Sequence, residues 1–241
     1  MLTLYGCITR RLSRCNGVSV QRDSTLVTST KALPGEVCAI TVDVDRWRSA
    51  LPETAWPEGF AADSKVWRQD VFDVAERWRR GEATALQLAA ASLAWGLGIT
   101  GYGRRRTRDV LDQDPDGSRL AISIEGLRDE RPTEADLLDA YERLFRGVGH
   151  VRGLGPAFFT KIIYFAGYRR GVGGLQPLIL DKVVAERLPD DAGGANRHES
   201  GWWPSTWRDY LYWAAKQAER PAYCGEPDHV EMDLFNGVWT P

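Results

Sequence analysis

The sequence predicts a mainly α-helical fold with a small β-containing part at its N-terminus, and three observations support this. Apolar residues recur at three- and four-residue steps from Val66 to Trp78, which is the spacing of one helix face. Residues 82–95 are rich in Ala and Leu almost all round, which is typical of a buried central helix. Thr133 and Asp136 have the spacing of a capping box before another periodic segment.

The first 60 residues have the weakest helical pattern. Residues 37–42 favour a short strand, and Pro34-Gly35 punctuates the chain just before them. We therefore divide the chain into an N-terminal extension or small lobe, residues 1–60, and a helical domain, residues 61–241.

The helical domain contains several further predicted elements. Gly101 and Gly103 favour a loop that runs into the basic residues 104–108. Pro156 suits the first turn of a helix that extends to about Tyr168. Further helices are expected after Asp181, from Ser205 or Thr206, and over residues 230–235.

Composition limits the classes of protein that the chain can represent. It has 241 residues, 43% hydrophobic residues and a formal net charge of −2, so it is long enough for a hydrophobic core but has no global basic field. A local basic face would still suffice for phosphate binding. The four cysteines form no CxxC pair, and we expect no metal site. No apolar run reaches the roughly 18 residues of a membrane span, and we expect a cytoplasmic protein.

A glycine-rich turn lies between two predicted helices, within residues 147–156. In Gly153-Leu154-Gly155, two glycines allow a tight reversal or a close backbone approach, while Leu154 points into the core. Pro156 begins the next helix, whose N-terminal N–H groups suit a phosphate oxygen, and Arg152 adds a cation. The alternative interpretation is that this turn only ends one helix and begins another.

Asp181 follows the apolar residues Leu178, Ile179 and Leu180 and precedes a short predicted helix. An aspartate in that position is an N-cap. Capping alone would explain the residue, and it is compatible with a chemical role.

The order of these features resembles a known superfamily. The run from Gly147 to Leu188 is similar to the helix-hairpin-helix DNA glycosylases, in particular to their 8-oxoguanine-glycosylase-like (OGG-fold) bacterial branch. Residues 159–166, 177–184 and 230–235 carry the likeness. The resemblance implies a bilobal helical fold with a DNA groove, and cleavage of the bond between a flipped base and its sugar. It also implies that Asp181 is catalytic, because a carboxylate stabilises the positive charge that develops on the sugar.

The resemblance leaves the role of Lys161 open. Members of the superfamily that also cut the DNA strand carry a lysine shortly after the second hairpin glycine, and its commonest position is Ala157 here. Lys161 lies one helical turn further along the same face, 20 residues before Asp181 (181 − 161 = 20). It is either a nucleophile that forms a Schiff base or an exposed, phosphate-binding lysine.

Two further groups of residues are candidates for contacts with DNA. A basic run follows the Gly-rich segment and suits a phosphate backbone, although a solvated helix start is the alternative; its first members are Arg104, Arg105 and Arg106. Aromatic residues near predicted turns suit a flipped base, although core packing is the alternative for each; they are Trp202, Trp203, Tyr102 and Phe158.

The sequence therefore predicts a DNA glycosylase acting as a monomer on double-stranded DNA that contains a modified base, associated with the nucleoid or with phage DNA. Proteins of this bacterial branch also resemble members of anti-phage defence sets, and the unfamiliar N-terminal region and the altered lysine position slightly favour a bulky hypermodified phage base, such as a glucosylated hydroxymethylcytosine. Repair of 8-oxoguanine by a glycosylase/lyase is the alternative. A non-catalytic DNA-binding module and a helical scaffold without a nucleic-acid role are further alternatives. No organic cofactor is implied, although such hairpins can hold a structural cation through backbone carbonyls.

Overall fold

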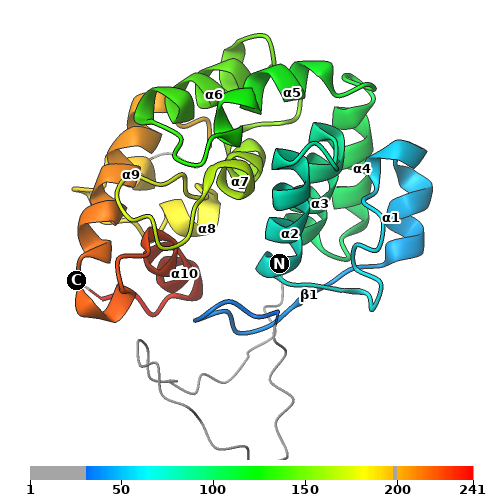
Figure 1. The fold of residues 1–241 in the computed structure, drawn as a ribbon. Coiled ribbons are helices and arrows are strands. Elements are labelled where there is room, and N and C mark those ends of the chain that lie inside the picture. Colours follow the sequence, from blue (N-terminus) through cyan, green and yellow to red (C-terminus); the bar gives the residue numbers. More distant parts are fainter. Residues whose placement is uncertain (1–30, 198–199, 241) are drawn as a thin grey trace, which may run out of the picture.

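A computed structural model describes residues 31–197 and 200–240, and it is mainly α-helical (Figure 1). The described sheet is small: β1 (Ile40–Thr41) pairs antiparallel with β2 (Lys65–Val66). The predicted fold class is confirmed. The pairing joins residues on both sides of the boundary expected at residue 60, and β1 falls within the predicted strand region 37–42.

Helix α1 (Val44–Ala50) lies in the part of the chain where the sequence pattern was least helical. Asp43 caps it by accepting the Arg46 N–H at 3.2 Å. Trp47 is fully buried, and its indole N–H donates to the carbonyl of Gly98 at 2.9 Å. This one aromatic anchor, followed by the short helix η1 (Glu53–Ala55), ties the N-terminal part to the end of α3.

The helices before the hairpin follow one another with short connections. Helix α2 (Arg68–Arg79) and helix α3 (Ala85–Leu97) pack against each other, and α3 is the expected central helix, with Thr84 and Gln87 forming a capping box at its start. Helix α5 (Ser118–Ile124) continues into η2 (Glu125–Arg128), and helix α6 (Glu134–Arg146) begins at the predicted Thr133–Asp136 capping box.

Helix α4 (Gly101–Leu111) corrects the expectation of a loop before the basic residues. The Thr100 hydroxyl accepts the Gly103 N–H at 3.3 Å and so caps the helix. A Cβ on Gly103 would lie 2.7 Å from Leu97 Cβ, so this glycine allows α4 to pass close to the end of α3. The basic run therefore belongs to a helix, and Gly103 in its first turn marks a close helix contact.

Helix α7 (Pro156–Gly167) occupies the centre of the molecule and is buried over most of its surface. Figure 1 shows α1–α4 on one side of it and α8 (Lys182–Ala185), α9 (Pro204–Ala218) and α10 (Pro227–Asn236) on the other. The short helices η3 (Ala195–Arg197) and η4 (Pro221–Tyr223) lie before α9 and α10. This two-sided arrangement is the expected bilobal fold, although α9 begins one residue earlier than predicted, at Pro204.

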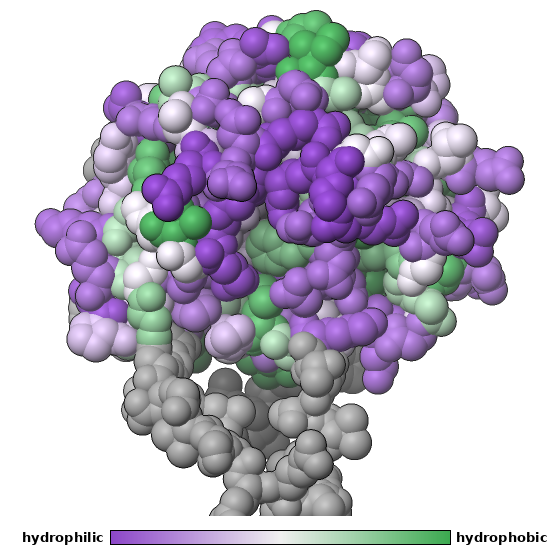
Figure 2. Space-filling view, viewed as in Figure 1, coloured by the Kyte–Doolittle hydropathy of each residue, from purple (hydrophilic) through white to green (hydrophobic). Residues whose placement is uncertain are grey.

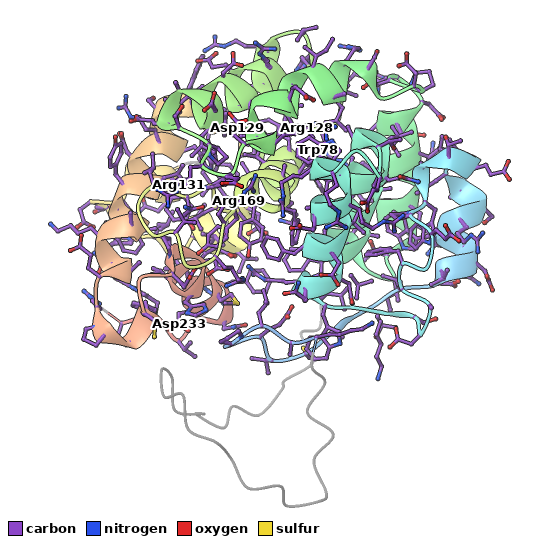
Figure 3. All side chains as sticks on the ribbon, in the orientation of Figure 1. Trp78, Arg128, Asp129, Arg131, Arg169 and Asp233 are labelled. Carbon is purple, nitrogen blue, oxygen red and sulfur yellow. The ribbon has the colours of Figure 1, made fainter. Side chains whose placement is uncertain are left out.

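A charged depression of about 780 Å³ lies at the C-terminal end of α7. Figure 2 shows the same face of the molecule as largely hydrophilic and hollowed, and Figure 3 places Arg128, Arg131 and Arg169 around its middle. Arg169 donates to the carbonyls of Leu127 at 2.7 Å and Asp129 at 2.6 Å, and Arg128 donates to the carbonyl at the end of α2. The guanidinium groups of Arg128 and Arg169 are therefore engaged in binding main-chain carbonyls near helix ends.

Among the residues that the structure describes, none of the helices combines the length and the apolar character that crossing a bilayer requires.

Candidate active site

Asp181 occupies the N-cap of α8, as the sequence predicted. The buried segment Leu178–Leu180 carries it there. One carboxylate oxygen, Oδ1, accepts the N–H groups of Val183 at 3.1 Å and Val184 at 3.2 Å. The second oxygen, Oδ2, faces away from the helix and is available for another partner. Capping and a chemical role therefore use different oxygens of the same carboxylate.

That partner is Lys161, which lies on α7. Its Nζ donates to Asp181 Oδ2 at 2.8 Å and to the carbonyl of Ala157, one turn earlier in α7, at 3.1 Å. The side chains are only 8% and 17% exposed, respectively, so the two opposite charges compensate each other in a largely desolvated setting. The structure brings together the two residues that the sequence nominated as catalytic, and Lys161 is not a solvent-exposed lysine.

Thr160 links these two segments, and it was not among the site residues predicted from the sequence. Its side chain is fully buried; the hydroxyl donates to the Pro156 carbonyl at 2.7 Å and accepts the Leu180 N–H at 3.1 Å. A single hydroxyl thus links the first turn of α7 to the residue before Asp181. A buried threonine inside an apolar helix is the only hint that a sequence pattern offers.

The pKa of the Asp181 carboxyl reflects a balance between burial and the lysine. Burial by itself raises that pKa, but the charge and hydrogen bond of Lys161 lower it, and the N–H groups of Val183 and Val184 lower it further. The net result is a pKa below the ordinary value for aspartate. The carboxylate therefore stays ionised at neutral pH although it is mostly removed from water.

The hairpin has the predicted tight turn. Gly153 has a φ of +93°, which other residues rarely adopt, and Leu154 is buried. Gly155 differs from the expectation, because its φ is −80° and a Cβ there would meet no protein atom within 4 Å. Neither backbone conformation nor protein packing requires a glycine at this position. Phe158 N–H already donates to Gly155 O at 2.9 Å, which leaves the amides of Gly155 and Ala157 as the candidate phosphate donors.

Arg106 connects the basic helix α4 to this hairpin. Its guanidinium donates to the Gly153 carbonyl at 2.7 and 3.0 Å and lies 4.1 Å from the centre of the Phe158 ring. The side chain of the neighbouring Arg105 is 78% exposed. Arg152, which belongs to the hairpin itself, is also exposed. Arg104 donates to the Ile99 carbonyl at 3.4 Å. Arg106 therefore joins the basic helix α4 directly to the glycine turn.

Side chains donate hydrogen bonds to four main-chain carbonyls in and around the hairpin. Arg106 occupies the carbonyl of Gly153, Gln113 donates to that of Arg152 at 3.1 Å, and Arg119 donates to those of Val148 and His150. Oxygens that accept hydrogen bonds from cationic side chains are poor ligands for a further positive charge.

The predicted base pocket is corrected by the structure at Trp202. This residue is 1% exposed, and its indole N–H donates to Ala195 O at 3.0 Å, so it belongs to the core. Trp203 is 53% exposed, but Arg146 lies 4.5 Å from its ring centre. Tyr102 and Phe158 gather around Arg106 near the hairpin, where Tyr102 is 68% exposed. None of these four aromatic rings is shown in contact with Asp181.

A buried polar cluster that the sequence analysis did not predict includes Arg68 of α2 and Tyr164, which lies about one turn after Lys161 on α7. Arg68 pairs with Glu231 at 2.7 Å and contacts the Tyr164 hydroxyl at 3.3 Å, with the Trp95 ring 4.9 Å away. Burial raises the pKa of Glu231, and the charge of Asp181 raises it further. Among the described residues, the Trp95 indole N–H and the hydroxyl of Tyr210 have no hydrogen-bond partner.

A glycine hairpin beside a basic helix, followed by a lysine–aspartate pair, defines a helix-hairpin-helix protein with a candidate glycosylase centre. A family model described as "Putative 8-oxoguanine DNA glycosylase OGG-like protein" matches residues 36–235, which is more than half of the chain. The chain belongs to this 8-oxoguanine DNA glycosylase-like family, and the predicted superfamily is confirmed. No curated protein and no solved structure matches it.

The Lys161–Asp181 pair predicts a specific dependence of stability on pH. A carboxyl whose pKa is lowered by folding stabilises the protein above its unfolded pKa of about 3.9, and that contribution is lost as the pH falls through the folded pKa. Asp181→Asn keeps the cap but removes the charge. We expect a loss of about 1.5–3 kcal/mol at pH 7 that shrinks at pH values below about 4, measured by urea unfolding.

Asp43→Asn is the matched control, because Asp43 also caps a helix but is exposed and lies away from Lys161. It should change the free energy of unfolding much less. Equal losses for both variants, or a loss at Asp181 that does not depend on pH, would contradict the proposed balance of charges.

Proposed function

We propose that this protein is a DNA glycosylase that excises a modified base from double-stranded DNA, with Asp181 and Lys161 as its catalytic residues. The observation that carries the proposal is the 2.8 Å contact between Lys161 Nζ and Asp181 Oδ2 at the start of α8. Lys161 lies on the same helix, α7, that begins at the hairpin. Membership of the 8-oxoguanine DNA glycosylase-like family supports this activity.

Asp181 supplies negative charge where the reaction develops positive charge. Cleavage of the N-glycosidic bond leaves the sugar electron-deficient at C1′, as in glycoside hydrolysis. A carboxylate whose pKa is held low stays ionised beside that carbon, and desolvation strengthens its attraction to the cationic sugar. The existing hydrogen bonds to α8 keep the carboxylate oriented before the substrate arrives.

If the protein is a glycosylase/lyase, Lys161 supplies the nucleophile and forms a Schiff base with the sugar. The Nζ ammonium group first releases one proton to solvent, and the resulting free amine forms a bond to C1′ while the bond from C1′ to the base breaks. The base leaves with the electron pair of that bond and takes up one proton, and the new amine nitrogen gives up one proton. If water attacks instead, Lys161 remains an ammonium group that orients Asp181, and base removal proceeds without a covalent intermediate.

The surface formed by the hairpin and α4 is the proposed DNA contact. The amides of Gly155 and Ala157 suit a phosphate oxygen, and the arginines of α4 add charge beside them. Because Arg106 already bonds Gly153, a phosphate at the hairpin would meet a preformed cationic group. This local surface provides the positive charge for phosphate binding that a net charge of −2 over the whole chain does not.

The unpaired polar groups near the Arg68–Glu231 pair support recognition of a base by hydrogen bonds. Trp95 offers an indole N–H, and Tyr210 offers a hydroxyl that can donate or accept. Burial raises the pKa of the Tyr210 hydroxyl, and the negative charges of Glu231 and Asp181 raise it further. A flipped base that reached these groups would satisfy polar atoms that are otherwise costly to bury.

The family description makes 8-oxoguanine the first substrate to test. The bulky hypermodified phage base that the sequence pattern slightly favoured stays a prediction, and both belong in the same experiment. Release of either base leaves an abasic site, which alkali converts to a strand break.

We expect the purified protein to produce abasic sites in duplexes that contain 8-oxoguanine opposite cytosine. Asp181→Asn should slow this roughly 10²–10⁴-fold while leaving DNA affinity nearly unchanged, because only the transition-state charge is lost. Oligonucleotide cleavage after alkali measures the rate, with hypermodified phage DNA as a parallel substrate. Binding without abasic product on either DNA, indifferent to Asp181→Asn, would instead identify a non-catalytic DNA-binding module.

Trapping with borohydride tests Lys161 separately. We expect a covalent protein–DNA adduct on the cleaved substrate that is absent from Lys161→Ala, because only an amine nucleophile forms a reducible imine. Lys182→Ala is the control, since this lysine is adjacent to Asp181 and 55% exposed. Base release without an adduct would assign the attack to water, and an adduct that survives in Lys161→Ala would remove Lys161 as the nucleophile.

Gly155→Ala tests the DNA contact of the hairpin. Alanine fits the observed backbone and meets no protein atom, so the free energy of unfolding should stay the same. If a phosphate approaches this position, the added methyl group displaces it, and we expect about a tenfold loss of DNA affinity, or about 1.4 kcal/mol. Gly153→Ala should instead lower stability because of its positive φ. Unchanged affinity in Gly155→Ala would place the DNA elsewhere.

A further inference from the structure

Gly96 lies on the exposed side of the last turn of α3 and touches Lys161. A Cβ built on Gly96 would lie 2.8 Å from both Cδ and Cε of the lysine, which is closer than Cβ atoms approach other atoms in real proteins. The neighbouring residues of α3 are mostly Ala and Leu, and alanine stabilises a helix better than glycine does. Helix propensity alone therefore argues against a glycine at this position.

Backbone conformation does not require this glycine either. The residue that ends α3 with a positive φ is Gly98, at +56°, and Gly96 is not among the described residues with a positive φ. Gly98, two residues later, is thus the glycine that ends the helix, and Gly96 is not needed for that purpose. What remains specific to Gly96 is the absence of a side chain where the lysine stem crosses α3.

The stem of Lys161 is held at both ends of its path. Its Cα belongs to the buried helix α7, which packs against α3, and its Nζ bonds Asp181 and Ala157. A lysine side chain has several rotatable bonds, and without such contacts its charged end group turns easily toward solvent. Contact with α3 along Cδ and Cε removes that freedom on one side.

We propose that Gly96 is a positioning residue: its missing side chain lets Lys161 lie against α3 and deliver its amine to Asp181. This inference rests on the proposed glycosylase function and names a residue that controls its catalytic pair. A methyl group at position 96 pushes the lysine stem outward. Because the end of a lysine is flexible, the fold accommodates the change, but the contact with the carboxylate does not survive it.

The displaced lysine changes the charge state of the site. Lys161 is what offsets the effect of burial on Asp181, so its departure leaves burial to raise the pKa of that carboxyl. Activity that needs the ionised carboxylate then begins at a higher pH. Charged groups that also act on Asp181 or its neighbours, Glu231 and Arg68, stay in place in this variant.

A double-mutant cycle tests the contact without relying on activity. Thermal unfolding is measured for wild type, Gly96→Ala, Lys161→Ala and the double variant. We expect Gly96→Ala to raise the melting temperature in the Lys161→Ala background, where the stem is gone and helix propensity acts alone. In the wild-type background it should leave the melting temperature unchanged or lower it. The same change in both backgrounds would overturn the proposal.

Kinetics test the positioning role. We expect Gly96→Ala to lower kcat by about 10²-fold with DNA affinity retained, and to move the acidic limb of the pH–rate profile to higher pH. Ser92→Ala, one turn earlier in α3, is the control and should shift neither. A wild-type rate and pH profile in Gly96→Ala would overturn the proposal. If the wild-type protein releases no base at all, the proposed function fails, and the thermal cycle still decides whether Gly96 places Lys161.

Discussion

The candidate site depends on one ion pair held largely out of water. Two opposite charges in such a setting are tolerated only as a pair, because each alone would carry the full cost of desolvation. The pair requires α3, α7 and the segment before α8 to be in register: Gly96 leaves room for the lysine, and Thr160 fixes the approach of Asp181. Two small, uncharged residues, Gly96 and Thr160, therefore determine where the two charges meet.

The same helix links this pair to the surface proposed to bind DNA. Helix α7 begins at the glycine turn and places Lys161 about one and a half turns inside, so a phosphate held at the hairpin would lie near the pair. Arg106 joins α4 to the turn by donating to the carbonyl of Gly153. In the proposed function, DNA anchoring and chemistry would share one helix, which would limit the movement of a bound sugar relative to the carboxylate.

Local signals in the sequence predicted those parts of the structure that depend on local physics. The Thr133–Asp136 box, Pro156 and the apolar run before Asp181 act within one or two turns, and each prediction is confirmed by the structure. Gly103 misled because glycine is selected both by a close contact between helices and by a loop. Trp202 misled because its neighbours favour a turn, whereas Ala195 satisfies its indole in the core. Contacts such as Gly96 with Lys161 join distant segments, and no local pattern encodes them.

The most direct test of this account is the pKa of Asp181, measured by NMR titration of its side-chain carboxyl carbon in the folded protein. We predict a value below the ordinary range for aspartate in the wild type, and a rise above it in Lys161→Met, where only the N–H groups of Val183 and Val184 still oppose the effect of burial. An ordinary pKa in the wild type, or the same pKa in both proteins, would contradict the claim that the lysine and the carboxylate form one desolvated pair.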